Sequence, residues 1–244
     1  MSEAGDERRN VQALVRQDDP ADALAVYYAL YAPAQTRAVF TAVDAAGVPD
    51  GFLVRARTAL DLFRPIVAFR ARTERAAESL IALGVPAARP VILAVPAHLG
   101  PWAYKYLQTS DAEVHRIYRL DAADHHPLVN VLATTGRDPN GGPRCEIRSG
   151  DQLGAVAGVN WQTSHFAEVY VYTDPAVRGR GWGKSVVSTV AGLVLATGRI
   201  PLYVVAENND YSIRLAEAVG FHDTGGREIL AEAVRPAESA PTIG

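Results

Sequence analysis

Hydrophobic residues in the C-terminal half of the chain follow two spacings in direct succession. Residues 169–172 are apolar or aromatic, which predicts a strand, and Asp174-Pro175 predicts its end. After a glycine-rich segment, apolar side chains recur every three to four positions, as on the buried face of an amphipathic helix: Trp182, Val186, Val187, Val190, Leu193 and Val194. The glycines therefore occupy a junction between a strand and a helix.

A second strand and a second helix follow this junction. Residues 201–206 are almost continuously apolar, which predicts a buried strand. Asn209 is a good N-cap residue and Gly220 a good C-terminal stop, so a helix is expected between them. Its apolar face would hold Ile213, Leu215, Ala216 and Val219.

The N-terminal half predicts a similar order of elements. Polar residues 1–19 predict a flexible leader, and Pro20 then opens a helix over residues 21–31. The elements expected next are strands at 37–43, 52–56 and 66–69, a helix at 73–83, a strand at 90–95, a helix at 99–108 and a strand at 113–120. Because this order recurs in the second half, we expect a degenerate N-terminal lobe over residues 20–121, a second lobe over 122–232 and a disordered tail over 233–244.

The beginning of the second lobe predicts turns and a hairpin. Residues 121–127 are expected to form a solvated linker and residues 128–135 a short helix. Two strands should flank Ser149-Gly150-Asp151, and a last strand is expected at 227–231. The linker carries adjacent histidines, His125-His126, but no third ligand accompanies them at a recognisable spacing, so no metal site is predicted.

Composition indicates an ordinary soluble protein of two domains. The chain has 244 residues, of which 48% are hydrophobic, and a net charge of −3, so no overall positive field would attract nucleic acid. The single cysteine, Cys145, cannot form an internal disulfide and is expected to be a small core residue in a reducing compartment. No signal core or membrane-spanning run is present, so we expect a cytoplasmic protein without a membrane partner.

The glycine-rich junction has the chemistry of an anion site. The first N–H groups of a helix have no partner inside the helix, and the peptide dipoles leave partial positive charge there. Gly179, Gly181 and Gly183 can adopt unusual backbone angles and leave their amides uncovered, while Arg178 and Arg180 can add charge-assisted hydrogen bonds. The sequence therefore predicts a cradle for a phosphate or diphosphate group.

Three motifs compete for these residues. Gly183-Lys184-Ser185 matches the end of a P-loop, but Arg178 occupies the place of its first glycine. The even G-x-G-x-G spacing also departs from the G-x-G-x-x-G fingerprint of dinucleotide-binding folds. The third motif, Arg-Gly-x-Gly-x-Gly after a strand ending in Thr-x-Pro, resembles the GNAT superfamily of acyl-CoA-dependent N-acetyltransferases. The later Asn-x-x-Ser helix with its Gly-Phe stop at residues 220–221 is similar to that family as well.

The resemblance covers roughly residues 165–222. It implies an α/β (α+β) fold in which a mixed, mostly antiparallel central sheet is flanked by helices. It also implies acetyl-CoA as the acyl donor and a small amine or peptide as the acceptor, and a homodimer is compatible with it. Carried over residue by residue, it implies cofactor contacts from Val171, Tyr172, Thr173, Arg178, Gly179, Arg180, Gly181, Trp182, Gly183, Lys184, Asn209, Ser212 and Leu215. For Asn209 and Ser212, helix capping explains the residues equally well.

Acyl transfer to an amine needs a base, an oxyanion site and a proton for the departing thiolate. In many members of the family a strand glutamate is the base, which implies Glu168. The spacing between Glu168 and Arg178 differs by one residue from that of the family, however, which would turn its side chain to the other face of the sheet unless a bulge compensates. The usual proton donor, a tyrosine after the helix leucine, is replaced by Ala216, so Tyr211, Tyr172, Tyr170 or water would supply the proton. A solvated glutamate and packed tyrosines would explain the same residues without catalysis.

Two other functions stay open. A non-catalytic acyl-CoA-binding or regulatory module is favoured by Ala216 and by residues 69–74, where the first lobe has arginines but no glycine. A P-loop-like nucleotide binder would rest on Gly183-Lys184-Ser185 alone.

Overall fold

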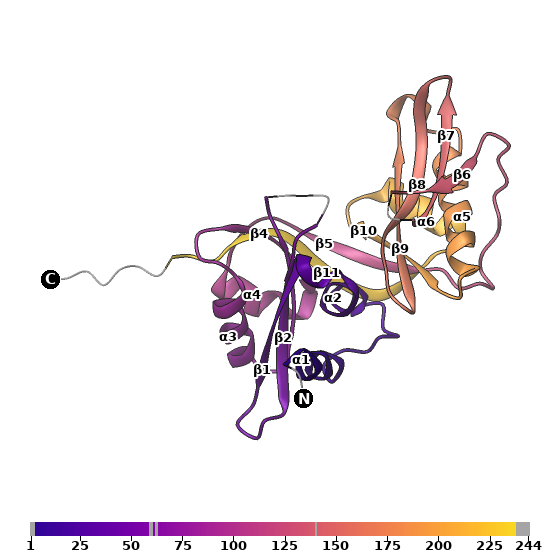
Figure 1. Ribbon diagram of the computed structural model, residues 1–244. Helices are drawn as coiled ribbons and strands as arrows, with labels where there is room; N and C mark the ends of the chain where they lie inside the picture. Colours follow the sequence, from indigo (N-terminus) through magenta and orange to yellow (C-terminus); the bar gives the residue numbers. More distant parts are fainter. Residues whose placement is uncertain (1–2, 59–60, 62, 140, 238–244) are drawn as a thin grey trace. The chain divides into compact units, whose positions relative to one another are not determined.

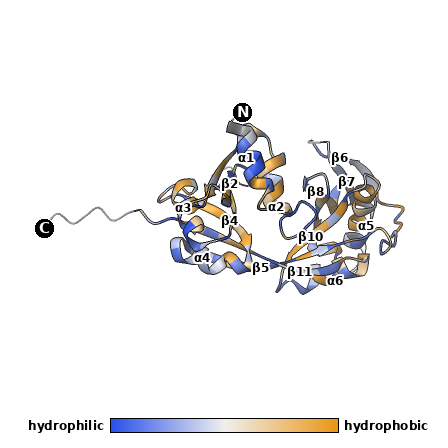
Figure 2. Cartoon of the chain, turned by 90° about the horizontal axis from the view of Figure 1, so that it is seen from below, coloured by the Kyte–Doolittle hydropathy of each residue, from blue (hydrophilic) through white to orange (hydrophobic). Residues whose placement is uncertain are grey.

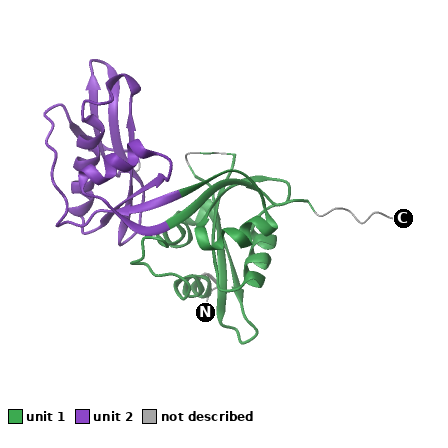
Figure 3. Cartoon of the chain, turned by 180° about the vertical axis from the view of Figure 1, so that it is seen from behind, with its two compact units in different colours: residues 1–114, 227–244 green, residues 115–226 purple. Residues whose placement is uncertain are grey.

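The computed structural model describes residues 3–58, 61, 63–139 and 141–237. The chain forms two compact units, Met1–Val114 with Arg227–Gly244, and His115–Gly226 (Figure 3). Both units are mixed, mostly antiparallel arrangements of strands flanked by helices, which is the fold class that the sequence predicted. In the part of the chain that the structure describes, no helix is long and apolar enough to cross a membrane. Most of the predicted tail, residues 238–244, lies outside the described residues.

The first unit is built on five strands in the order β1-β2-β3-β4-β11 (Figure 1). Neighbouring strands are antiparallel except β3 and β4, which are parallel and are joined by helix α3. Its elements before β5 are α1 (Glu3–Gln12), α2 (Ala23–Val26), a π-helical turn (Tyr27–Tyr31), a 3-10 turn (Ala34–Thr36), β1 (Arg37–Val43), β2 (Pro49–Ala56), β3 (Ile66–Ala71), α3 (Glu74–Gly84), β4 (Pro90–Pro96), a 3-10 turn (Ala97–Leu99) and α4 (Gly100–Tyr106).

Strand β2 is buried on both of its faces. Leu53 packs in one apolar cluster with Leu80 of α3, whereas Phe52 and Val54 belong to a second cluster that includes α2 and Val11 of α1. Val11 is fully buried, so α1 is part of this core, and the N-terminal segment differs from the flexible leader expected over residues 1–19. The polar composition of that segment concealed a helix that is anchored through one valine.

The second unit has the strand order β5-β10-β9-β8-β7-β6. Its neighbouring strands are antiparallel except β9 and β10, which are parallel and are joined by helix α5. Figure 2 shows the hydrophobic residues along β10 here and along β4 in the first unit. The remaining elements are β5 (Gln108–Arg119), β6 (Thr134–Arg137), β7 (Pro143–Ser149), β8 (Gln152–Gln162), β9 (Phe166–Thr173), a 3-10 turn (Pro175–Val177), α5 (Trp182–Leu195), β10 (Ile200–Ala206), α6 (Asp210–Val219) and β11 (His222–Val234).

Two strands pair outside the half of the chain in which they occur. Strand β5 follows β4 and α4 in sequence, yet it pairs with β10, with Arg119 opposite Leu202. Strand β11 follows β10 and α6, yet it pairs with β4, with Ile229 opposite Val95. The first compact unit is therefore made of two separate stretches of sequence, whereas the second, His115–Gly226, is continuous. The lobe boundaries at residues 20, 121 and 232 assume two continuous domains and stay predictions.

Local expectations for the linker between the lobes are wrong in two places. The helix expected over residues 128–135 does not form; Asn130 instead begins a turn in which its side-chain oxygen accepts the N–H of Leu132. His125 is not part of a solvated linker, because its ring Nε2 lies 3.0 Å from the carbonyl oxygen of Ser188 in α5. Both segments contact α5, about 60 residues further along the chain, where the Leu128 N–H also donates to the Ser188 hydroxyl at 3.0 Å, and local sequence does not reveal such contacts.

The hairpin and the cysteine behave as predicted. Strands β7 and β8 pair around residues 149–152. Cys145 is fully buried in the core of the second unit, and burial raises the pKa of its thiol. Its role as a small core residue is confirmed.

Candidate functional site

The glycine-rich junction leaves β9 through a 3-10 turn that a carboxylate closes. Asp174 accepts the N–H of Ala176 at 2.8 Å, and its own N–H donates to the Gly154 carbonyl at 2.8 Å. Beyond the turn, Gly179 and Gly181 have φ values of +84° and +77°, a left-handed region that glycine enters at little cost. The turn therefore fixes the point at which the chain opens toward α5.

Six consecutive backbone N–H groups, those of residues 179–184, have no acceptor among the described residues. The first N–H of this segment with a partner is that of Ser185, which donates to the Gly181 carbonyl at 3.1 Å. No atom lies within 4 Å of a Cβ placed on Gly179 or Gly181. Unengaged amides at the start of a 14-residue helix carry partial positive charge, so this backbone can bind an anion.

The third glycine has a packing role. A Cβ on Gly183 would lie 2.7 Å from the Thr173 hydroxyl and 3.0 Å from Leu215 Cδ1, so only glycine lets α5 approach the end of β9 and α6. The side chains of Trp182 and Leu215 are buried, and a Cβ on Gly154 would lie 2.4 Å from the Trp182 ring. For these two residues among the predicted cofactor contacts, the structure shows core packing.

Three residues in or next to the segment with free amides carry positive charge: Arg178, Arg180 and Lys184. The Arg178 guanidinium carbon lies 5.6 Å from the centre of the Tyr211 ring on α6, and that of Arg180 lies 5.4 Å from the Trp182 ring. The side chains of Arg178, Arg180 and Lys184 are exposed, and none forms an ion pair with a carboxylate of the described residues. Their charges are available to an anionic ligand.

The equivalent junction of the first unit is occupied by its own side chains. Arg70 is buried, with its Nε 2.6 Å from an oxygen of Asp22. Thr73 caps α3 by accepting the N–H of Ala76 at 3.2 Å, and its hydroxyl donates to Asp50 at 2.7 Å. The backbone that could meet a phosphate in the second unit is thus covered in the first.

The parallel strands β9 and β10 separate soon after they meet. Their pairing comprises Phe166 with Ile200, Ala167 with Pro201 and Glu168 with Leu202, and it stops there. Residues 169–173 have no pairing to β10, although they continue to pair with β8 on their other side. Main-chain groups on one edge of β9 are therefore open to a ligand that binds like a strand, next to the predicted contacts Val171, Tyr172 and Thr173.

Glu168 lies at the last pair before the strands separate. Strand β9 is regular there, and the irregularity is in β8, where Asn160 is passed over between Val159 and Trp161. Glu168 shares a strand face with Tyr170 and Tyr172, whereas Val169 on the other face is buried against the α5 side of the core. Position 168 thus belongs to the face turned away from α5.

The environment of Glu168 favours a proton acceptor. Burial raises the pKa of its carboxyl group, and hydrogen bonds from Asn160 and Trp161 partly oppose the shift. The amide nitrogen of Asn160 donates to Oε1 at 3.1 Å. Because the ideal catalytic pKa lies near the working pH, a raised carboxyl pKa suits a general base.

The contact between α6 and β10 brings in a residue, Tyr203 of β10, that sequence reasoning missed. Asn209 accepts the N–H of Ser212 at 3.1 Å, so its side chain caps the helix. Capping is one of the two roles predicted for it, and cofactor contact, the other, stays a prediction. The hydroxyl of Ser212 lies 3.3 Å from that of Tyr203, a buried residue of β10 next to Leu202. Burial raises the pKa of Tyr203, while the Ser212 hydrogen bond lowers it, so the phenol is protonated at neutral pH. Tyr203 is distinguished from other buried tyrosines by its place in the structure, next to Leu202, the last residue of β10 that pairs with β9.

The other proton donors predicted from sequence lie apart. Tyr211 is on α6 beside Arg178, and Tyr172 is exposed on β9. At about 3.3 Å per residue, Tyr172 is ~13 Å along the strand from Glu168. Ala216, at the place of the family's usual tyrosine, is fully buried in the core.

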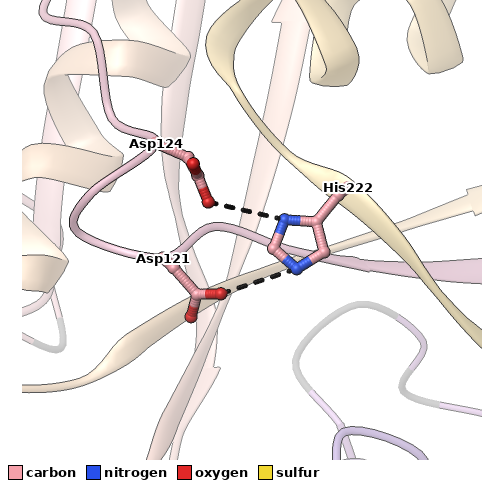
Figure 4. Close-up of side chains that lie close together, drawn as sticks. All are labelled: Asp121, Asp124 and His222. Atoms are coloured by element: carbon pink, nitrogen blue, oxygen red, sulfur yellow. Dashed lines mark ion pairs between the residues drawn. The ribbon is translucent and has the colours of Figure 1, made fainter.

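A small cluster of metal-ligand types forms at the start of the second unit. Asp121, Asp124 and His222 offer ligand atoms that all lie within 4.8 Å of one another (Figure 4). His222 lies 3.5 Å from Asp121 and 3.9 Å from Asp124, and Arg119 already pairs with Asp121. The cluster is at the surface, and its ion pairs account for its geometry. The prediction that the protein needs no metal stays a prediction.

One family model matches the C-terminal part of the chain. Residues 147–229 match the family model FR47-like protein, which covers the free amides, Glu168 and α6. A search of curated proteins found no match.

Solved structures share the fold over most of the chain. An acetyltransferase of the GNAT family from Novosphingobium aromaticivorans is 18% identical, with 76% of this chain and 89% of that one covered and a TM-score of 0.58. A GCN5-related N-acetyltransferase from Sphaerobacter thermophilus is 13% identical, with coverages of 95% and 93% and a TM-score of 0.61. A tandem GNAT protein from the clavulanic acid biosynthesis pathway is 15% identical, with coverages of 97% and 98% and a TM-score of 0.60. The protein therefore has the fold of GNAT acetyltransferases.

Proposed function

We propose that this protein of GNAT fold, whose residues 147–229 match the FR47-like family, transfers an acetyl group from acetyl-CoA to a primary amine. The observation that carries the proposal is the run of free N–H groups at residues 179–184. They fit a diphosphate because the glycines leave the backbone uncovered, and Arg178, Arg180 and Lys184 add unpaired positive charge.

The open edge of β9 would hold the rest of the donor. Residues 169–173 have main-chain groups that β10 does not use, and the amide-rich pantetheine arm could pair with them as a strand does. Bound there, acetyl-CoA would supply a thioester next to Glu168, where the two strands separate. The same main-chain N–H groups could stabilise the carbonyl oxygen as it gains negative charge.

Glu168 and Tyr203 would act from opposite faces of the sheet. Glu168 lies on the face away from α5, where it would take the proton of the attacking amine. Tyr203 lies on the α5 and α6 side, where its protonated hydroxyl would donate to the departing thiolate. Tyr203 is thus a candidate for the task of the missing tyrosine at position 216, beside Tyr211, Tyr172 and Tyr170, the candidates predicted from sequence.

Binding of acetyl-CoA is the first test. We expect calorimetry to give a one-site isotherm and the melting temperature to rise with donor concentration, because a ligand of the native state stabilises it. ATP with magnesium should not compete; a preference for ATP would support the nucleotide-binding alternative instead.

A non-catalytic acyl-CoA-binding or regulatory module is the second candidate, favoured by the buried Ala216. Release of free CoA thiol on a panel of small amines and peptide N-termini separates the two. Turnover on any of them supports the enzyme, whereas tight acetyl-CoA binding without turnover supports the module. A cytoplasmic location and a homodimer belong to the same proposal, and fractionation and sedimentation would check them.

A further inference from the structure

The first unit contains a cavity of about 480 Å³ that the proposed function does not use. It lies where β3 and β4 begin, so it is at the other end of β3 from the junction with α3. Its lining includes Arg37, Arg55, Arg57 and Arg89, and none of the described residues that line it is an aspartate or a glutamate. Cavities of this size are typical of small-molecule sites.

The hydrogen bonds that these arginines form among the described residues all go to neutral carbonyl oxygens. Arg55 donates to the Gly84 carbonyl at 2.8 Å, Arg57 to the Gln35 carbonyl at 3.3 Å and Arg37 to the Tyr28 carbonyl at 3.4 Å. Arg89 is exposed and forms no ion pair or hydrogen bond within the part of the chain that is described. Each guanidinium has five N–H donors, so most of these donors are open to a ligand.

Nearby acidic groups are committed elsewhere or lie outside the lining. Asp61 and Glu232 both pair with Arg64, which does not line the cavity. Burial lowers the pKa of Arg37; Glu7 partly raises it and Arg8 lowers it further. Arg55, Arg57 and Arg89 line the same cavity with no carboxylate among the described lining residues, and a bound anion would offset their mutual repulsion.

We propose that this cavity binds a small phosphorylated molecule, with its phosphate groups held by Arg55, Arg57 and Arg89, because Arg37 turns its guanidinium to the other face of the sheet, toward the Tyr28 carbonyl. A phosphate or diphosphate carries more charge per volume than a single carboxylate, and guanidinium forks match its oxygens in pairs. Phe63 is almost fully exposed at the cavity, and Pro65 and Pro86 also line it, so an apolar or planar part of the ligand would have a surface to contact. A concave site suits a small ligand better than a nucleic-acid strand.

Pyrophosphate is the probe for this site, used with the full chain at constant ionic strength. Calorimetry would compare the wild type with Arg89→Ala, and with Arg75→Ala as the matched control, because Arg75 is an exposed arginine of the same unit outside the cavity. Arg180→Ala alters the amide cradle and shows whether pyrophosphate binds there instead of in the cavity. We expect Arg89→Ala to weaken pyrophosphate binding by about tenfold, and Arg75→Ala to change it by less than about twofold.

Chemical modification locates the bound probe independently. Phenylglyoxal modifies accessible arginines, and we expect pyrophosphate to protect Arg57 and Arg89 but not Arg75, as read by mass spectrometry. Melting temperatures without ligand show whether each variant is folded. Four results would overturn the proposal: no binding by the wild type, loss of all binding in Arg180→Ala only, citrate binding at least as tightly as pyrophosphate, or displacement of the probe by a short RNA at lower concentration. None of them depends on acetyl-CoA, so this proposal and the acetyltransferase proposal can fail separately.

Discussion

Glu168 and Leu202 form the last pair of the parallel ladder between β9 and β10. One residue further along each strand, the chains no longer pair, and the edge of β9 becomes available. The carboxyl group at this point has a pKa raised by burial, and the neighbouring position in β10 is Tyr203. A proton acceptor, an open strand edge and a phenol therefore lie within a few residues of one another.

Covering the amides should abolish donor binding. In Gly181→Val, the new side chain lies over the free N–H groups and the positive φ adds strain of about 1–2 kcal/mol. We expect acetyl-CoA affinity, measured by calorimetry, to fall at least ~100-fold through loss of several charge-assisted hydrogen bonds. Gly198→Val is the matched control, because Gly198 has φ +78° and open space but lies in the loop after α5. Equal acetyl-CoA affinities in the two variants would contradict binding of the donor at the amides of residues 179–184.

Removing the carboxylate should slow turnover without preventing binding. We expect Glu168→Gln to lower kcat by about 10²–10⁴ while acetyl-CoA still binds. Glu146→Gln is the control, since Glu146 is a strand glutamate of the same unit that is paired with Arg144. A kcat that is the same in Glu168→Gln and the wild type would contradict its role as the base.

The pH dependence follows from the direction of the Glu168 shift. Only the carboxylate can accept a proton, so activity should be low in acid and rise as pH passes the raised pKa. The midpoint should lie above the ordinary glutamate value of about 4.3. Initial rates across pH, with the stability of the protein checked at each value, would test this. A rate independent of pH above about 4 would mean that Glu168 is not the group that titrates.

Replacing candidate tyrosines one at a time would test which of them is the proton donor. Tyr203→Phe keeps the buried ring and removes the hydroxyl that lies 3.3 Å from Ser212. We expect it to lower kcat by about 10²-fold or more with little change in acetyl-CoA affinity, and Tyr211→Phe and Tyr172→Phe to change kcat less than about threefold. If Tyr211→Phe has the largest effect, the sequence-based assignment is preferred over Tyr203.

Gly183 should prove structural. A Cβ there would press on the Thr173 hydroxyl and on Leu215, so we expect Gly183→Ala to destabilise the protein by about 1–3 kcal/mol. Gly136→Ala is the control, because that position is open and has no unusual φ. Urea unfolding midpoints would measure both. A neutral Gly183→Ala would mean that α5 can shift away from β9 without cost.

Sequence patterns were sufficient where the signal is local. Alternating and helical spacings located β9, α5, β10 and α6, and the N-cap at Asn209 and the stop at Gly220 follow from single-residue preferences. The amides of the cradle could be predicted because a glycine-rich segment before a helix exposes its own backbone. The sheet face on which Glu168 lies could not be predicted in this way, because the irregularity beside it is in β8, eight residues upstream at Asn160.

Tertiary structure decided what depends on partners far along the chain. Strands β5 and β11 pair with β10 and β4 because a strand needs a neighbour with a free edge, and the sequence of a strand does not say which edge that is. The same applies to Tyr203, whose hydroxyl meets Ser212 only through the packing of α6 on β10, and to the arginines of the cavity, which come from β1, β2 and the segment before β4. By itself the sequence determined the local elements and the free backbone of the cradle, since these depend on neighbouring residues, whereas long-range pairing set the strand order, the facing of Glu168 and the grouping of charge.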